Sequence, residues 1–494
     1  MPTLLDALSD VSTLTVVLLC ISLLIALFYE VINGFHDAAN AIAMIVYTNS
    51  LDARNSVLMS GIMNFLGVMI GGIGVAYTIV HLLPLDVLVS SDKSATLVMI
   101  FSLLLSAMIW NLSTWYFGLP TSSSHALIGS LIGVSAIFGV MNGFELAQSI
   151  NWSVVYIILG ALALSPLVGF GGGYLFMWLS RKYITTQKFY KSPESETKRK
   201  RPNFWMRMGI IATGAGVSFA HGSNDGQKGM GIIMIILMGI LPSYYALNME
   251  SKQYKILQVH DSAQNLAKYY KDNKLELDSL IDNNTLRTPL KARNEIVECS
   301  INQVYETTSF IAKKLDGIES YSALSESDRW RVHTAILCSN NFFEQFEKTL
   351  PASQKDKKEY ISIQRKVLLS DSEYVPKWVI IAVALSLGLG TMIGYKRVLV
   401  TIGEKIGTQP ISYMQGSLSQ AVSMVTILLA NITHAPVSTT HIVSSSIAGT
   451  MVAEPGASVQ KSTLRAIVLS WIFTLPTTAI LSSSIYFMLS KVFI

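Results

Sequence analysis

Two short polar segments each occur twice in an otherwise apolar chain, and both contain residue types that bind anions or protons. The segment Gly34 to Asp37 resembles the segment Gly222 to Asp225, which lies 188 residues later. The segment Pro120 to His125 resembles the segment Pro436 to His441, which lies 316 residues later. Hydroxyl and free backbone N–H groups donate to oxyanions, whereas a carboxylate in apolar surroundings attracts a cation or a proton. Because both segments recur at fixed offsets, a binding site is favoured over the ordinary use of Ser and Thr in helix packing.

The hydroxyl-rich segments predict a pocket for one small tetrahedral anion. Proline followed by serine and threonine is typical of a helix N-terminus, where backbone N–H groups and the helix dipole favour negative charge. Two such N-termini that face each other provide donors without any arginine. The candidate anion ligands are Thr121, Ser122, Ser123, Ser124, Ser438, Thr439 and Thr440.

The carboxylates of Asp37 and Asp225 occupy equivalent positions in the two copies and predict coupling to a cation. Beside an anion site a bare carboxylate repels the substrate, so it needs a cation, a proton or a protonated ligand. Monohydrogen phosphate can donate its O–H group to a carboxylate and sulfate at neutral pH cannot, which leads to the hypothesis that the anion is phosphate. Capping of the following helix is the alternative role for each aspartate. The expected coupling residues are Asp37, Asn40, Asn224, Asp225 and Lys228, and the candidate metal ligands are Asp37 and Asp225.

The other ionisable residues in or beside these segments each have two interpretations. Lys228, at the position equivalent to Asn40, either pairs with an anion or an aspartate or extends its side chain to the membrane interface. Glu30 either faces the cavity or lies in the hydrated interior of a helix bundle. The histidines either relay protons or form structural hydrogen bonds, which is the commoner case. These histidines are His36, His125, His221 and His441.

The elements that position these residues are predicted to be membrane helices, each of which needs about 20 apolar residues to span a bilayer. Apolar blocks lie near residues 12–33, 56–80, 95–117, 153–180, 207–221, 228–242, 376–395, 412–432 and 464–490, with shorter blocks at 36–48, 119–142 and 436–453. Both repeated motifs fall between or at the ends of blocks, which predicts broken helices or re-entrant hairpins at mid-depth, since irregular backbone in a membrane survives only where it lines a cavity. The expected fold is an all-α polytopic membrane protein with about 10–12 spans.

Charged residues concentrate in two regions, which predicts one soluble insert and one basic loop. The 494-residue chain is 51% hydrophobic and 14% charged, yet residues 243–375 contain 18 of its 37 Lys and Arg residues and 19 of its 32 Asp and Glu residues. Residues 181–207 contain nine basic and two acidic residues, so the net charge of +5 reflects membrane topology rather than nucleic-acid binding. The apolar positions over 254–270 and 333–349 predict a small helical insert.

The two repeat offsets differ by 128 residues, so the second copy contains an insertion of about this length. The predicted domains are membrane repeat 1 (1–180), a basic cytoplasmic loop (181–207), the first part of membrane repeat 2 (208–242), the hydrophilic insert (243–375) and the second part of membrane repeat 2 (376–494). If the copies are inverted, the insert lies outside the cytoplasm, and the charges of loops 81–94 and 396–411 agree with this arrangement. Cys299 and Cys338 would then lie where a disulfide can form.

These residues resemble the motifs of the inorganic phosphate transporter family, the PiT permeases. The hallmark of the family is a duplicated G-x-N-D-like segment followed in each half by a P-x-S-x-x-H hairpin, and the match covers roughly residues 12–242 and 376–490. The insert and the overall length are similar to those of the low-affinity phosphate permeases of Gram-negative bacteria. The resemblance implies two inverted repeats, secondary active phosphate uptake by a multi-pass protein of the bacterial inner membrane, and a homo-oligomer, expected to be a dimer.

The resemblance leaves the coupling ion open between a proton and sodium. It implies that bacterial permeases of this kind couple to protons and take a neutral complex of phosphate with a divalent metal, whereas relatives in other organisms couple to sodium. Many sodium-coupled members carry glutamates where this chain has Asn64 and Gln420, and His36 stands where many members have asparagine. The loss of two carboxylates weakens a site for a hard cation, which favours the proton.

The sequence therefore predicts a phosphate symporter driven by protons, with phosphate and the lipid bilayer as its partners and no resident cofactor. The alternatives are a sodium-coupled symporter or a sulfate permease of the same family, and a passive anion channel, against which the paired intramembrane aspartates argue. The sequence contains no GxxxxGK[ST] segment for ATP and neither a metal cluster nor an activated nucleophile that would indicate an enzyme.

Overall fold

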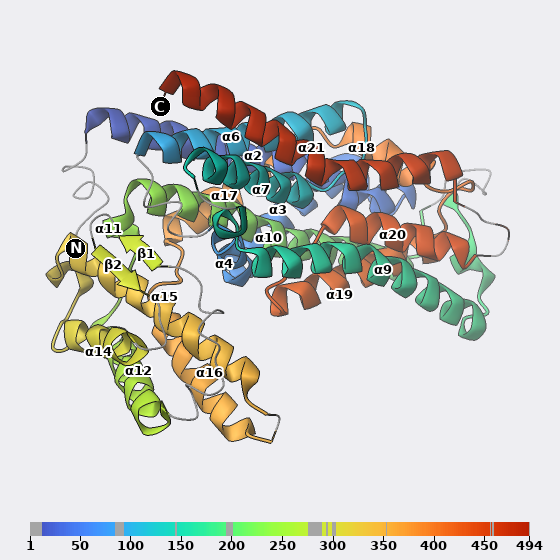
Figure 1. The fold of residues 1–494 in the computed structure, drawn as a ribbon. Coiled ribbons are helices and arrows are strands. Elements are labelled where there is room, and N and C mark those ends of the chain that lie inside the picture. The colour runs from blue at the N-terminus through green and yellow to red at the C-terminus, as the bar shows by residue number, and fades with distance from the viewer. Residues whose placement is uncertain are drawn as a thin grey trace. The chain divides into compact units, whose positions relative to one another are not determined.

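The computed structural model of the chain describes residues 12–83, 93–143, 146–193, 201–274, 289–292, 295–298, 303–351, 353–454, 456 and 459–493. The chain divides into two compact units, both mainly helical (Figure 1). The membrane unit consists of residues 21–83, 97–233 and 376–494, and the insert unit consists mainly of residues 234–375.

Five helical elements of the first copy follow its apolar blocks. They are α2 (Thr13–Tyr47), the pair α3 (Ala53–Ile70) and α4 (Gly74–Val80), α6 (Lys93–Tyr116), α7 (Ser123–Met141) and α9 (Trp152–Tyr183). The short helices α8 (Leu146–Ser149) and η1 (Gln187–Tyr190) precede and follow α9. The axes of α3 and α4 are bent by 76° at the break between them.

The second copy repeats this order among the described residues. Its elements are α10 (Phe204–Ile240), the pair α17 (Lys377–Thr391) and α18 (Lys396–Val400) with its π-helical extension η5 (Thr401–Lys405), α19 (Tyr413–Ile432), α20 (Thr439–Val452) and α21 (Lys461–Phe493). The second bent pair has an angle of 58°, and the last helix of each copy contains an internal proline, Pro166 in α9 and Pro476 in α21. Five elements per copy is an odd number, which is what an inverted repeat requires.

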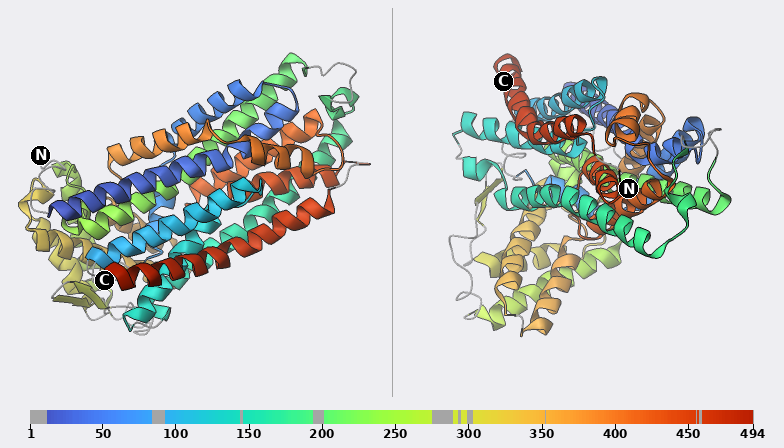
Figure 2. Two further views of the ribbon diagram at one scale, coloured as in Figure 1. Left: turned by 90° about the horizontal axis from the view of Figure 1, so that it is seen from above. Right: turned by 90° about the vertical axis from the view of Figure 1, so that its right-hand side faces the viewer.

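The two copies interlock in the membrane unit. Helix α7 of the first copy packs along α21 of the second, and α9 of the first packs along α20 of the second (Figure 1). The axes of the long helices of this unit are roughly aligned with one another (Figure 2). The hairpin helix of each copy is therefore held by the last helix of the other copy.

The first repeated motif lies within a continuous helix in both copies, so the predicted break at this motif is wrong. Helix α2 continues through Gly34 and Asp37, and α10 continues through Gly222 and Asp225. The glycines allow close helix crossing instead: a Cβ atom on Gly34 would lie 2.4 Å from the Leu387 carbonyl oxygen of α17, and one on Gly222 would lie 2.2 Å from the Asn64 carbonyl oxygen of α3. Continuous helices keep every backbone hydrogen bond satisfied in lipid, which is why the polar motif does not need a break.

The second repeated motif does interrupt the helices, as predicted. The chain leaves α6 at Tyr116 and enters α7 at Ser123, and it leaves α19 at Ile432 and enters α20 at Thr439. Ser122 and Ser438 are the N-caps, and each side-chain oxygen accepts a hydrogen bond from the backbone N–H of the residue three positions later. A cap of this kind stabilises a helix by about 1 kcal/mol.

Among the described residues, five helices are long and apolar enough to cross a membrane, or up to seven if each bent pair is one span, compared with the 10–12 spans expected. The expectation counted as two blocks what the structure shows as one helix in both α2 and α10. Three further helices of the membrane unit are shorter or more polar than these spans. Helix α20 has only 14 residues, α10 contains the polar stretch from His221 to Lys228, and α19 contains the polar residues Gln415 and Gln420.

The insert unit is helical as predicted, apart from one β-hairpin. Its elements are α11 (Pro242–Tyr245), α12 (Gln253–Asp272), strands β1 (Pro289–Ala292) and β2 (Glu295–Glu298), α14 (Val304–Leu315), η4 (Tyr321–Ala323), α15 (Glu326–Thr349) and α16 (Lys355–Leu369). The strands are antiparallel, and Phe342, Phe343 and Phe346 of α15 are buried in a core with α12 and α14. Cys338 is disulfide-bonded, whereas Cys299 lies outside the described residues.

Candidate functional site

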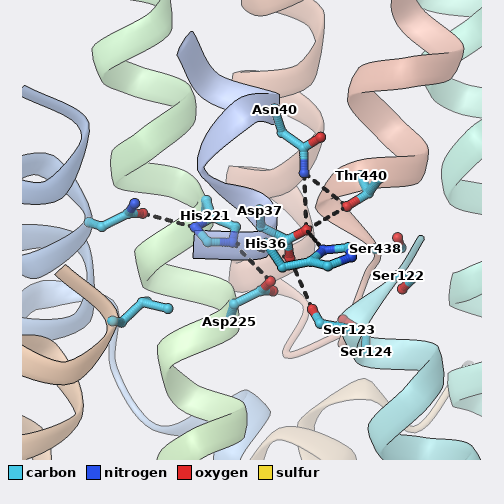
Figure 3. A network of polar contacts seen from close by, with 12 residues as sticks. His36, Asp37, Asn40, Ser122, Ser123, Ser124, His221, Asp225, Ser438 and Thr440 are labelled. Carbon is cyan, nitrogen blue, oxygen red and sulfur yellow. Dashed lines mark hydrogen bonds and ion pairs between the residues drawn. The ribbon is translucent and has the colours of Figure 1, made fainter. Parts of the chain in front are cut away.

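The carboxylate of Asp37 is buried and accepts hydrogen bonds from both copies of the repeat (Figure 3). Its Oδ1 atom accepts from Asn40 Nδ2 at 3.2 Å and from Thr440 Oγ1 at 2.9 Å. Its Oδ2 atom accepts from Ser123 Oγ at 2.9 Å. His36 Nδ1 lies 3.1 Å from Oδ1. Charge-assisted hydrogen bonds of this number stabilise the ionised carboxylate in a place that lipid and protein shield from water.

The carboxylate of Asp225 is buried too, but its main partner is a cation. Lys228 Nζ forms an ion pair with Asp225 Oδ1. The same ammonium group donates to Ser124 Oγ at 2.5 Å and to the Val437 carbonyl oxygen at 2.9 Å. Lys228 is only 2% exposed, so it pairs with the aspartate and does not extend to an interface.

These two arrangements are related by the sequence repeat. Asn40 and Lys228 are equivalent residues, and each donates to the aspartate three positions before it. Thr440 and Ser124 are also equivalent, and each lies on the hairpin helix of one copy and contacts the site of the other. Thr440 accepts a hydrogen bond from Asn40, and Ser124 accepts one from Lys228. The site is therefore built at the interface of the repeats, the place where transporters built from repeats bind their substrates.

The N-termini of α7 and α20 meet at this network. Ser123 and Ser124 of α7 and Thr439 and Thr440 of α20 are first-turn residues, whose backbone N–H groups lack partners within the helix. The Thr439 hydroxyl is buried and has no hydrogen-bond partner among the described residues. The arrangement provides hydroxyl and N–H donors together with one ammonium group, which suits an oxyanion.

The structure brings four of the seven predicted anion ligands to the first turns of these helices and assigns other contacts to three. The oxygens of Ser122 and Ser438 serve as caps, so these residues position the helices. Thr121 Oγ1 lies 3.2 Å from His36 Nε2 and donates to Thr114 Oγ1 at 2.9 Å, on the side of His36 away from Asp37. All seven residues are buried.

His221 joins the two carboxylates, a role that no sequence spacing assigned to it specifically. Its Nε2 atom lies 3.1 Å from Asp225 Oδ2 and 3.6 Å from Asp37 Oδ2. Its Nδ1 atom lies 2.9 Å from Asn64 Oδ1, which fixes the ring. The i, i+4 spacing of His221 and Asp225 on a continuous α10 would have indicated this contact, but the predicted helix break at Gly222 hid it.

Asp37, His221 and Asp225 together form a candidate cation site. One ligand atom from each lies within 4.8 Å of the others, and all three residues are buried. The predicted metal ligands Asp37 and Asp225 are thus brought together, with the histidine as a third ligand. Imidazole and carboxylate ligands suit a divalent transition metal better than a hard monovalent cation.

Asn224 is the one predicted coupling residue that the structure places elsewhere. Its side-chain amide donates to Asn431 Oδ1 at 2.6 Å and to the Ala435 carbonyl oxygen at 3.2 Å. These contacts hold the segment before α20 and leave Asn224 outside the carboxylate network.

Asn64 and Gln420, the two positions at which the resemblance predicts glutamates in sodium-coupled relatives, are both buried amides with structural partners. Asn64 donates to Thr391 Oγ1 at 2.9 Å and contacts His221. Gln420 donates to the Ala41 carbonyl oxygen at 3.0 Å and accepts from Thr213 Oγ1. Neither amide carries the negative charge that a sodium site draws on.

The sequence matches one known protein family over most of its length. The model of the phosphate transporter family matches residues 33–482. The chain belongs to the phosphate transporter family.

Relatives in this family share nearly the whole chain. The low-affinity inorganic phosphate transporters PitA and PitB of Escherichia coli K12 are each 40% identical over 487 residues, covering 96% of this chain and 97% and 96% of theirs. A low-affinity inorganic phosphate transporter of Buchnera aphidicola from Acyrthosiphon pisum is 41% identical over 476 residues, which cover 95% of this chain and 96% of that one. These relatives extend through the insert as well as both membrane repeats.

A solved structure supports the fold of this family member. The sodium-dependent phosphate transporter aligns over 96% of this chain and 100% of its own, with a TM-score of 0.53 and 17% identity. At this identity the likeness concerns the fold alone. This phosphate transporter family member is a multi-pass membrane protein, in agreement with the apolar helices described above.

Proposed function

We propose that this protein is a secondary active symporter that imports inorganic phosphate across the bacterial inner membrane, driven by protons. Phosphate transport follows from membership of the phosphate transporter family, which is a family of membrane transporters rather than enzymes. The observation that carries the mechanism is the buried network in which Asp37 and Asp225 contact hydroxyl groups at the N-termini of α7 and α20. Because the two copies share this network, relative motion of the repeats would open it to either side.

Phosphate fits the donors and the acceptor of this network. The hydroxyl groups of Ser123 and Thr440 now donate to Asp37, and both can turn toward a substrate oxygen. Monohydrogen phosphate can in turn donate its O–H group to the Asp37 carboxylate. Lys228, which already contacts Ser124, supplies the positive charge on the side of α7. Sulfate has no proton at neutral pH and would face the carboxylate with repulsion only.

The proton is favoured over sodium as the coupling ion by the ligands present. His221 lies between the two carboxylates, and a histidine exchanges protons readily near neutral pH. A sodium site draws on several hard oxygen ligands, and the amides Asn64 and Gln420 are occupied by other partners. Sodium coupling stays the alternative.

A divalent metal co-transported with phosphate is compatible with the same site. Asp37, His221 and Asp225 would hold such a cation as part of the substrate. Lys228 competes for Asp225, so metal entry requires its ammonium group to move to the phosphate. The expected homodimer stays a prediction.

The test is uptake of labelled phosphate into sodium-free proteoliposomes under an imposed inward proton gradient, with Asp37→Asn and Asp225→Asn as matched variants. We expect accumulation above equilibrium in the unmodified protein and its loss in both variants. Uptake that begins only when sodium is added would show that the coupling ion is sodium and not the proton. Equilibration without accumulation under either gradient would indicate a passive channel, and stronger competition by sulfate than by unlabelled phosphate would indicate a sulfate permease.

A further inference from the structure

A polar stripe on α2 extends beyond the site. Glu30, Asn33, Asp37 and Asn40 are spaced by three and four residues, which places them on one face of this helix. Glu30 lies seven residues before Asp37, or about 10 Å along the axis at 1.5 Å per residue. Its side chain is fully buried. The stripe thus carries two carboxyl groups, of which the site described above uses one.

The two carboxyl groups of the stripe have opposite surroundings. Asp37 accepts hydrogen bonds from Asn40, Thr440 and Ser123. Neither oxygen of Glu30 accepts a hydrogen bond of ordinary geometry from any described residue, and its nearest polar neighbour is the side-chain amide of Asn33 on the same helix. An isolated ionised carboxylate in such surroundings is very costly, whereas a protonated carboxyl group is not. Glu30 is therefore suited to a neutral state and Asp37 to a charged one.

Glu30 faces α10 beside the ion pair of the site. The carboxyl carbon of Glu30 lies 2.4 Å from the position that a Cβ atom on Gly229 would take. Gly229 directly follows Lys228 and lies one turn beyond Asp225, so the absence of a side chain there lets the carboxyl group reach α10. The ionisable groups around Glu30 are Tyr29 on its own helix and His221, Asp225 and Lys228 on α10.

The carboxyl group is present in one copy of the repeat only. The residue 188 positions after Glu30 is Ser218, whose hydroxyl group donates to Ser60 Oγ at 2.9 Å and to the Gly214 carbonyl oxygen at 3.0 Å. The packing of the equivalent position in the other copy thus needs only a small hydroxyl group.

We propose that Glu30 is the residue that carries the coupling proton. This inference rests on the proposed proton-coupled symport, and the step forms and breaks only an O–H bond. The Glu30 carboxylate takes up a proton from the side of higher proton concentration, and the neutral acid is then buried at the place that its side chain occupies in this structure. The proton leaves to water when the other side opens. Lys228 and Asp225, one turn away, sense whether this charge is present. In this scheme Asp37 binds the substrate, and Glu30 couples transport of the substrate to transport of a proton.

The test separates phosphate binding from coupling in proteoliposomes containing Glu30→Gln. In an exchange assay, with equal phosphate and pH on both sides, labelled phosphate equilibrates without net proton movement. We expect Glu30→Gln to keep this exchange close to the unmodified rate, and to lose accumulation under an inward proton gradient so that the inside-to-outside ratio falls to the equilibrium value. Gly229→Ala, whose methyl group presses on the carboxyl group, is expected to reduce accumulation and keep exchange, with Gly209→Ala on the open face of α10 as its control.

Each other outcome is decisive. Full accumulation by Glu30→Gln would overturn the role of Glu30 while the proposed symport stands. If Glu30→Gln loses both exchange and accumulation while its unfolding temperature is unchanged, Glu30 is part of the substrate-binding site. This result would also overturn the inference. No proton-driven accumulation by the unmodified protein, with exchange intact, would instead refute the proposed function itself.

Discussion

At the residue scale, the two halves of the site differ in charge, because one has an asparagine where the other has a lysine. Asn40 and Lys228 occupy equivalent positions, and each donates to the preceding aspartate and contacts a hydroxyl group of the opposite copy. The amide leaves Asp37 as a net negative charge, whereas the ammonium group neutralises Asp225. The site is thus polarised although its residues occupy equivalent positions in the repeat, and under the proposed function this polarity would orient an anion with one acidic hydrogen.

The ion pair predicts a strongly non-additive mutant cycle. Lys228→Met leaves Asp225 as a buried charge with only His221 beside it, and Asp225→Asn leaves the ammonium group of Lys228 unpaired. We expect each single variant to lose about 3–5 kcal/mol of stability, and the double variant to be more stable than either, because the pair is removed as a unit. Thermal unfolding of the purified protein in detergent measures this. Additive losses would show that the pair is not buried as described.

At the element scale, two glycines of the repeated motif set the distance between helices. Gly34 lets α2 cross α17, and Gly222 lets α10 cross α3. In each case a carbonyl oxygen of the other helix lies too close to the glycine to leave room for a Cβ atom. In a membrane, packing of this kind holds helices together because lipid provides no hydrophobic force between them. These crossings fix α2 and α10, and with them the two aspartates.

Substitution of glycines in α10 tests this role within one helix. Gly222→Ala forces its methyl group onto the backbone of α3 and is expected to cost about 1–3 kcal/mol and to lower the unfolding temperature. Gly209→Ala meets no atom of the described residues within 4 Å and is expected to be neutral or to stabilise the helix slightly. Equal unfolding temperatures for the two variants in detergent would contradict the close crossing.

At the scale of the whole molecule, the copies exchange their last helices. Each hairpin helix, α7 or α20, packs along the final helix of the other copy. Because these helices are packed together, a movement of the hairpin helix in one copy would shift the last helix of the other copy. Such coupling suits a transporter whose site is shared by both repeats. The odd number of elements per copy favours opposite orientations of the two copies in the membrane.

Inverted copies predict the side of each loop. A cysteine at Lys271, an exposed residue of α12, is expected to react with a membrane-impermeant maleimide in intact cells, in a Cys20→Ser background. A cysteine at Gln409, exposed in the loop before α19, is expected to react only after permeabilisation. The reverse pattern would place the insert in the cytoplasm and refute the predicted topology.

The sequence by itself determined the class, the repeats and the residues of the candidate site. The apolar blocks predicted membrane helices, and the two offsets identified Asp37 with Asp225 and Asn40 with Lys228 as equivalent residues. The helix starts at Ser123 and Thr439 follow from local chemistry, since a serine cap acts over three residues. These features depend on spacing along the chain, which a sequence contains directly.

The tertiary structure alone decided how the helices cross and which side chains have partners. Sequence spacing favoured helix breaks at Gly34 and Gly222, because a glycine between polar residues indicates either a break or a close crossing, and only the backbone of the other helix distinguishes them. Two features depend on residues far apart in the chain: the contact of His221 with both aspartates, and the burial of the Glu30 carboxyl group against α10. Hydrogen-bond partners and burial are properties of packing, so local sequence could name these residues but could not assign their roles.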